Sequence, residues 1–210
     1  MTGGEIIEFL KEDIKKYEKP SRYAHTMGVL DECAYIAKKT GLDDGDALCL
    51  FIAALCHDIT KNLSGGEHAA LCLRHGIEYN DSPVLHQDTA AAFITEKYGT
   101  FTQICDGRVL SAVSKHTTGG DCMTLIDTAL FVADFTEAGR KYDICVKMRE
   151  YLHGICEKIS ENDMSAARAA LYETARTICE HTVNHLEASG EDIDPRTYKT
   201  LAFFTKPTRE

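Results

Sequence analysis

Apolar residues recur at helical spacing along most of the chain, and few stretches alternate as a half-buried strand would. Within residues 5–17, Ile6, Leu10 and Ile14 share one face of a helix, because three to four residues complete each helical turn. The same spacing predicts helices over residues 21–40, from 43 to 58, and over 67–75, 85–98, 106–115, 123–137, 143–158 and 164–188. The pattern therefore favours an all-α fold.

Prolines and glycines mark the expected ends of these helices. Pro20 is expected to stop the first helix, with Ser21 capping the second and Gly41 ending it. The tail contains Pro195 and Pro207 and is expected to be partly irregular. No repeat or low-complexity segment interrupts residues 1–210. We therefore expect a single-domain helical bundle, with its core over about 20–140 and C-terminal helices over about 141–190 packed on it.

The composition narrows the class of protein and of partner. At 210 residues with 44% hydrophobic residues, the chain is long enough to bury a sizeable core. Its formal net charge of -10 argues against nucleic acid as the main partner, because a phosphate backbone requires a basic face. Nine cysteines without a CxxC pair are expected to be reduced thiols. The N-terminus has no signal-peptide pattern and the longest apolar run is too short to span a bilayer, so we expect a cytoplasmic protein without a membrane partner.

The doublet His57-Asp58 closes the apolar run 47–56 and is the first candidate for chemistry. Such a run belongs in a core, where an ionised aspartate beside a histidine is costly unless something pairs with both. A divalent cation fits that need, since imidazole nitrogen and carboxylate oxygen are both ligands for transition metals. Taken alone, such a doublet is more often a helix end with a solvated His-Asp pair.

Two further residues are candidate metal ligands for the same reason as the doublet. Asp134 lies near the end of a segment that is apolar almost all round, and His25 lies among core-like positions of its helix. His25, the doublet and Asp134 belong to three predicted helices, and helix bundles build metal sites from side chains on facing helices. A nitrogen and oxygen set without cysteine argues against structural zinc and suits iron, manganese or another transition metal.

The order of these residues carries a resemblance. His25, His57-Asp58 and Asp134 are similar to the signature of the HD-domain metal-dependent phosphohydrolases, and the flanking residues resemble one bacterial branch, the YqeK family. The segments that carry this resemblance are RYAHTMGV at 22–29, HDITKNL at 57–63, LH at 85–86, KHTTG at 115–119, VADFTEAGR at 132–140 and, in the tail, IDPRT at 193–197. The chain departs from the family pattern at residues 87–88 and 138–139 and in a longer stretch over 101–108, without losing a ligand.

The resemblance implies an all-α HD-domain enzyme that cleaves diadenosine tetraphosphate symmetrically into two ADP. It implies that His25, His57, Asp58 and Asp134 bind the metal, which in this family is iron, with manganese or another transition metal as the alternative. Asp58, or alternatively Asp134, is also expected to orient the attacking water. Two other functions stay open: an HD phosphohydrolase for another nucleotide, such as a deoxynucleotide or an alarmone, and a non-catalytic nucleotide sensor.

Five more residues are expected to contact the substrate. Lys61 shares the side of Asp58 if the helix continues for one turn, and its ammonium suits charge on a leaving phosphate. Arg22 and Arg140 match phosphate oxygens bidentately, with surface salt bridges as the competing interpretation. His86 and His116 fall at junctions of loop and helix. We favour phosphate contact for these two histidines, with a second metal as the alternative.

Two other patterns are expected to be ordinary features of helices. His181 and His185 are spaced to share a helix face but have no third ligand nearby, so a solvated face is expected. The acidic stretch 43–46 lacks the remaining ligands of a calcium loop. It is typical of a helix N-terminus, where negative charge is favourable. The sequence leaves open whether the chain forms a homodimer.

Overall fold

Helices account for all of the regular structure. The computed structural model describes residues 1–160 and 163–206, and over them it contains ten α-helices, one short 3-10 helix and no β-strand. In chain order these are α1 (Gly3–Asp13), η1 (Ile14–Lys16), α2 (Pro20–Thr40), α3 (Asp44–Cys56), α4 (Gly65–His75), α5 (Leu85–Tyr98), α6 (Gly107–Lys115), α7 (Leu125–Thr136), α8 (Asp143–Cys156), α9 (Met164–Ser189) and α10 (Pro195–Thr205). The predicted all-α class is confirmed.

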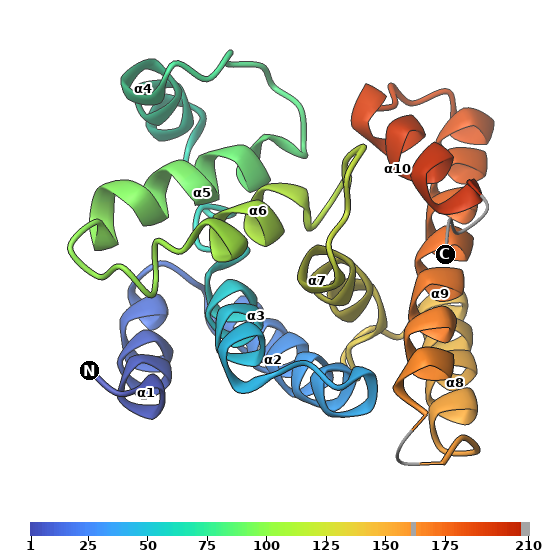
Figure 1. Cartoon of the computed structure of the whole chain (residues 1–210). Coiled ribbons are helices and arrows are strands. Elements are labelled where there is room, and N and C mark those ends of the chain that lie inside the picture. Colours follow the sequence, from blue (N-terminus) through green and yellow to red (C-terminus); the bar gives the residue numbers. More distant parts are fainter. Residues whose placement is uncertain (161–162, 207–210) are drawn as a thin grey trace.

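Helices α3 and α7 form the centre of the fold. α3 contacts α1, α2, α6 and α7, while α7 contacts α2, α3, α6, α8 and α9. In Figure 1, α7 accordingly lies between the α2–α3 pair and the long helix α9. A helix surrounded in this way has to be apolar on nearly every face, and Leu50, Leu55 and Val132 are fully buried. The apolar runs that lead to His57 and Asp134 are therefore the core.

The start of α2 differs from the expectation. The helix begins at Pro20 itself, and Lys19 rather than Ser21 is the residue that precedes the first turn. Capping by Ser21 is wrong because proline fits the first helical position, where a backbone N–H has no partner in any case. Gly41 ends the helix as expected, in the left-handed conformation at φ 65°.

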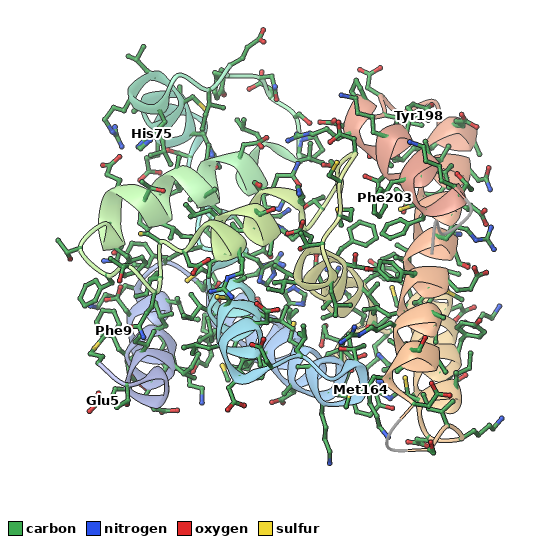
Figure 2. All side chains as sticks on the ribbon, in the orientation of Figure 1. Glu5, Phe9, His75, Met164, Tyr198 and Phe203 are labelled. Carbon is green, nitrogen blue, oxygen red and sulfur yellow. The ribbon has the colours of Figure 1, made fainter. Side chains whose placement is uncertain are left out.

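The C-terminal helices pack on one side of the centre. α8 and α9 contact α7, and α9 also contacts α2 and α10. α10 begins at Pro195 behind the cap residue Asp194, and Phe203 (labelled in Figure 2) and Phe204 pack against the core. The tail is more regular than its prolines indicate, since Pro195 occupies the first turn of a helix. Pro207 lies outside the described residues.

No helix within residues 1–160 and 163–206 combines the length and hydropathy that crossing a membrane requires. The nine cysteines are all free thiols, and seven of them are buried. Burial raises the pKa of the Cys56 thiol well above its ordinary value, as it does for Cys33. These thiols stay protonated and act as small core residues.

Candidate metal centre

The four residues predicted to bind a metal meet where α2, α3 and α7 come together. His25 lies in the second turn of α2, His57 and Asp58 directly follow α3, and Asp134 lies in the last turn of α7. Nε2 of His25 is 3.0 Å from Asp134 Oδ1 and 3.9 Å from Asp58 Oδ2. Nε2 of His57 is 3.5 Å from the same Asp58 oxygen. His25, His57 and Asp58 can each offer one ligand atom within 4.8 Å of the others.

His86 and His116 extend this cluster on the other side of Asp58. His86 is the second residue of α5, and His116 directly follows α6. Their Nε2 atoms lie 3.3 Å and 3.6 Å from Asp58 Oδ1, whereas His57 contacts Oδ2. These two histidines and Asp58 form a second group with ligand atoms within 4.8 Å of one another. Asp58 therefore presents one carboxylate oxygen to each group.

Backbone hydrogen bonds set the direction of three imidazoles. In His57, His86 and His116, Nδ1 lies 2.7–2.8 Å from the carbonyl oxygen of the residue three positions earlier. A carbonyl only accepts, so Nδ1 must carry the proton. In the neutral ring the Nε2 lone pair is then left for the cluster, which is the state a metal ligand requires.

Several buried atoms of the cluster have no hydrogen-bond partner among the described residues. They are Nε2 of His25, Nε2 of His57 and Oδ1 of Asp58, whose close contacts within the cluster do not have hydrogen-bond geometry. The Nε2 atoms of His86 and His116 lie 3.1 Å apart, so two lone pairs face each other when both rings are neutral. Buried polar groups are normally paired, and one or more cations among these atoms would satisfy all of them. The donor set, imidazole and carboxylate without thiolate, fits a transition-metal ion.

Charge within the cluster is shared between His57 and the two aspartates. Burial opposes a charge on His57, but Asp58 beside it and the more distant Asp134 outweigh burial and raise the pKa of His57 to about 9. Burial also opposes charge on Asp58, yet His57 and His116 hold the pKa of that carboxyl well below its ordinary value. In the absence of an ion, a proton on His57 therefore compensates the carboxylates.

The pKa of His86 is shifted in the opposite direction to that of His57. Burial is the main cause, and with the neighbouring His116 and Lys61 it outweighs the attraction of Asp58 and lowers the pKa of His86 to about 4. A neutral imidazole at physiological pH can donate its Nε2 lone pair without first losing a proton.

Arg22 and Arg140 are paired with the aspartates. Arg22 Nη1 is 2.7 Å from Asp58 Oδ2, and Arg140 Nη2 is 2.7 Å from Asp134 Oδ1. The two arginine side chains keep 30% and 34% of their surface exposed. Arg22 and Arg140 thus form the salt bridges that were the competing interpretation. Because these salt bridges are made to aspartates of the metal centre, an anion bound there could also reach the two arginines.

Lys61 reaches the cluster without the predicted extension of the helix. α3 ends at Cys56, and the chain continues in tight turns, one of them closed by the Lys61 amide on the Asp58 carbonyl. The Lys61 Nζ lies 3.0 Å from Nε2 of His86. The premise of a continued helix is wrong, because the residues after Cys56 bond three rather than four positions back, but Lys61 still lies beside the cluster.

Glu137 has a role that the sequence did not indicate. Its Oε1 lies 3.2 Å from Nδ1 of His25 and accepts that hydrogen bond, while Oε2 accepts from the Gly139 amide. A Cβ on Gly28 would collide with this carboxylate, which explains a glycine inside α2. A carboxylate behind a histidine orients the ring and raises its basicity. The sequence does contain a signal for this contact: Gly28 stands three residues after His25, and the buried Glu137 stands three residues after Asp134.

Gln87 connects the two segments that carry His86 and His116. It is fully buried, its Nε2 donates to Thr118 Oγ1 at 2.8 Å, and its Oε1 accepts from the amides of Thr117 and Thr118 at 3.2 Å each. The departure from the family pattern at this position thus supplies a brace. It holds the start of α5 against the turn after α6.

The two minor patterns lie away from this cluster. No group of three metal ligands within the described part of the chain includes His181 or His185, whose rings stack at 6.0 Å between centroids. Asp43 accepts a hydrogen bond from the Asp46 amide and caps α3. The acidic stretch is the helix N-terminus that its composition indicates.

The chain matches a known family and several characterised relatives. The HD domain model matches residues 22–139. A symmetrical bis(5'-nucleosyl)-tetraphosphatase of Halalkalibacterium halodurans is 30% identical over 154 residues, which cover 71% of this chain and 76% of that protein. The enzyme of the same name from Bacillus subtilis is 27% identical over 205 residues, covering 95% and 96% of the two chains. That of Staphylococcus aureus is 31% identical over 139 residues, covering 64% and 68%.

A solved structure shares the fold. The crystal structure of a predicted HD superfamily hydrolase from Clostridium acetobutylicum superposes with a TM-score of 0.75 at 23% sequence identity. The match covers 94% of this chain and 95% of that one. The similarity of fold therefore extends over the C-terminal helices as well.

Proposed function

The chain belongs to the HD domain family, together with the symmetrical tetraphosphatases it resembles, and from that premise we propose that it hydrolyses diadenosine tetraphosphate to two ADP. Its relatives carry that activity in their names at 27–31% identity. The observation that supports this most directly is the cluster of His25, His57, Asp58 and Asp134, with its unpartnered buried ligand atoms and adjoining cations. An acidic protein that handles a polyphosphate needs such a local concentration of positive charge.

We propose that His25, His57, Asp58 and Asp134 hold a metal ion, with iron as the first candidate and manganese as the second. When bound, a divalent or trivalent ion lowers the pKa of a water ligand and polarises a phosphoryl oxygen, which are the two requirements of phosphoanhydride hydrolysis. Asp58 is placed to orient the attacking water, because both of its oxygens face the cluster and only Oδ2 is held by Arg22.

We further propose that His86 and His116 hold a second ion together with Asp58 Oδ1. The opposed Nε2 atoms of the two histidines at 3.1 Å support this over direct phosphate contact, because a cation relieves the repulsion of two lone pairs and a phosphate oxygen adds to it. The low pKa of His86, about 4, keeps that ring unprotonated and ready to bind an ion.

The cations around the cluster are assigned to the polyphosphate. Lys61 Nζ lies 3.0–3.1 Å from the two ring nitrogens of His86 and can donate to a leaving phosphate once His86 is occupied by other contacts. Arg22 and Arg140 offer their exposed N–H groups to non-bridging oxygens while holding Asp58 and Asp134 in place. Charge that develops on the leaving ADP is thereby met by fixed donors.

Product analysis tests the proposed reaction. With metal-loaded protein, diadenosine tetraphosphate is expected to yield ADP alone, two molecules for each substrate and water consumed. In oxygen-18 water, one of those two ADP molecules is expected to carry the label on its terminal phosphate, because water attacks an inner phosphorus and ADP leaves. Release of AMP with ATP, or of inorganic phosphate alone, would contradict symmetrical cleavage.

A panel of nucleotides separates the alternatives. An HD phosphohydrolase for a deoxynucleotide or an alarmone would turn over that nucleotide faster than diadenosine tetraphosphate. A non-catalytic sensor would bind nucleotides without turnover at any metal loading. The retained metal ligands and Lys61 favour an enzyme, because a binding module has no use for an ion that activates water.

Glu137→Gln is expected to lower metal affinity at His25 and hydrolysis together, by about 10- to 100-fold. Glutamine keeps the volume but replaces the carboxylate that accepts from His25 Nδ1, so the imidazole becomes a weaker ligand. Metal titrations and kcat/KM measure the two effects. Glu150→Gln, an exposed glutamate of α8, is the matched control and is expected to change neither; an unaltered Glu137→Gln variant would refute the role given to Glu137.

We also infer that the reaction takes place in the cytoplasm. Nine free thiols, seven of them buried in the core, are suited to a compartment that keeps cysteine reduced.

A further inference from the structure

A cavity of about 350 Å³ opens beside the metal centre, between the start of α4 and the segment that leads into α5. Figure 1 shows α4 and this segment at the outer edge of the molecule, next to α5. Two of its lining residues, Lys61 and His86, belong to the metal centre, so the cavity adjoins that centre. The volume lies at the low end of the range of roughly 300–1,000 Å³ for small-molecule sites. It therefore suits one nucleoside rather than a whole dinucleotide.

The lining of this cavity changes its charge from one end to the other. Lys61 and His86 form the end at the metal centre, where phosphate is favoured. Residues 79–83 form the rest together with Gly65, His68 and Leu85, and Asp81 places a carboxylate among them. A carboxylate repels phosphate but accepts hydrogen bonds from hydroxyl groups. A matching ligand is anionic at one end and carries neutral hydroxyls further along, as a nucleotide does.

Tyr79 supplies an aromatic wall that is held in place from two sides. Its hydroxyl donates to Asp81 Oδ1 at 2.7 Å. Its tip also approaches Gly65, where an added Cβ would come within 3.1 Å of the tyrosine oxygen. Tyr79 as a whole residue nevertheless remains 42% exposed. A fixed and partly exposed ring is suited to stacking on a base, because little side-chain freedom is lost when the base binds.

We propose that this cavity is a nucleoside subsite of the substrate, with the base against Tyr79 and the ribose hydroxyls donating to Asp81. The proposal rests on the proposed hydrolysis of a dinucleoside polyphosphate and adds to it the site of one of the two nucleosides. The phosphate chain then leaves the cavity past Lys61 and enters the metal centre. Tyr79 and Asp81 thus determine the preference for a ribonucleoside over a bare polyphosphate.

Calorimetric titration of ADP into the metal-loaded protein tests the subsite. Tyr79→Ala is expected to weaken ADP binding about tenfold, the size of one lost base–aromatic stack, whereas Tyr79→Phe keeps the ring and retains the affinity. Asp81→Ala is expected to weaken ADP about tenfold, the size of a lost hydrogen bond to a charged group, and to leave 2',3'-dideoxy-ADP unchanged. With diadenosine tetraphosphate as the substrate, Tyr79→Ala and Asp81→Ala are expected to raise KM and to leave kcat unchanged.

The control is Tyr151→Ala, which removes an exposed tyrosine of α8, a helix far from α4 in Figure 1. It is expected to bind ADP as the wild-type chain does. The subsite is refuted if ADP does not bind, if Tyr79→Ala and Asp81→Ala keep wild-type affinity, or if Asp81→Ala weakens ADP and the dideoxy analogue equally. The proposed function fails on a different result: wild-type protein loaded with metal that releases no ADP from diadenosine tetraphosphate, whatever its affinity for ADP.

Discussion

Replacement of Asp58 by asparagine is expected to lower hydrolysis of diadenosine tetraphosphate by about a thousandfold or more. Removal of a single preorganised electrostatic partner from a water-excluded site already costs about 10²–10³ in rate. Asp58 is more than one partner, because its two oxygens face His57 on one side and His86 and His116 on the other. Asparagine preserves the volume, so the loss reports on charge and metal binding rather than on packing.

Circular dichroism and thermal unfolding are needed beside the assay, since Asp58 is buried and its loss leaves Arg22 without that partner. The fold is expected to persist, because the core of α3 and α7 does not include this side chain. His57→Ala is expected to give the same loss of activity. Asp31→Asn, at an exposed position of α2, provides the control with wild-type rate. An Asp58→Asn variant with near-full activity would mean that these residues are not the catalytic metal site.

The core and the clustering of the four candidate ligands could be predicted from the sequence for one physical reason. An aspartate at the end of a helix that is apolar all round must either be paired or bind an ion, and both Asp58 and Asp134 stand in that position. The structure brings them together with His25 and His57 as the pattern of helices indicates. The family resemblance narrowed the chemistry further, because the residues around each ligand are more specific than the ligands themselves.

What could not be predicted depends on where a helix stops and which way a side chain then points. The end of α3 at Cys56 changes the path of Lys61, and local turn geometry of this kind is not encoded in hydrophobic spacing. The brace formed by Gln87 and the carboxylate of Glu137 behind His25 join segments far apart in the chain. Polar pairs of this kind leave no periodic signal, so only the coordinates reveal them.

Removal of the metal is expected to abolish hydrolysis and to lower the melting temperature by about 10 °C. An ion that binds only the folded chain stabilises it by about 4 kcal/mol at a thousand times its dissociation constant, and each kcal/mol corresponds to roughly 2–4 °C for a chain of this size. The unpartnered atoms of His25, His57 and Asp58 supply that binding energy. Chelation followed by anaerobic addition of Fe²⁺, or of Mn²⁺, is expected to restore both activity and melting temperature, with two ions per chain by elemental analysis.

The effect of the metal on stability is expected to increase with pH, because an ion must displace the proton on His57. The pKa of His57 in the metal-free fold is about 9, above the value of about 6.5 for an unfolded histidine. A raised folded pKa stabilises the metal-free fold fully below about pH 6.5, and this contribution is lost as the pH rises through 9. Over the same interval metal binding strengthens by up to about tenfold per pH unit, since the ligand has to be unprotonated. The melting-temperature difference between loaded and metal-free protein should therefore widen from pH 6.5 to 9 in the wild-type chain and much less in His57→Ala; a difference independent of pH in the wild-type chain would show that His57 is not a ligand.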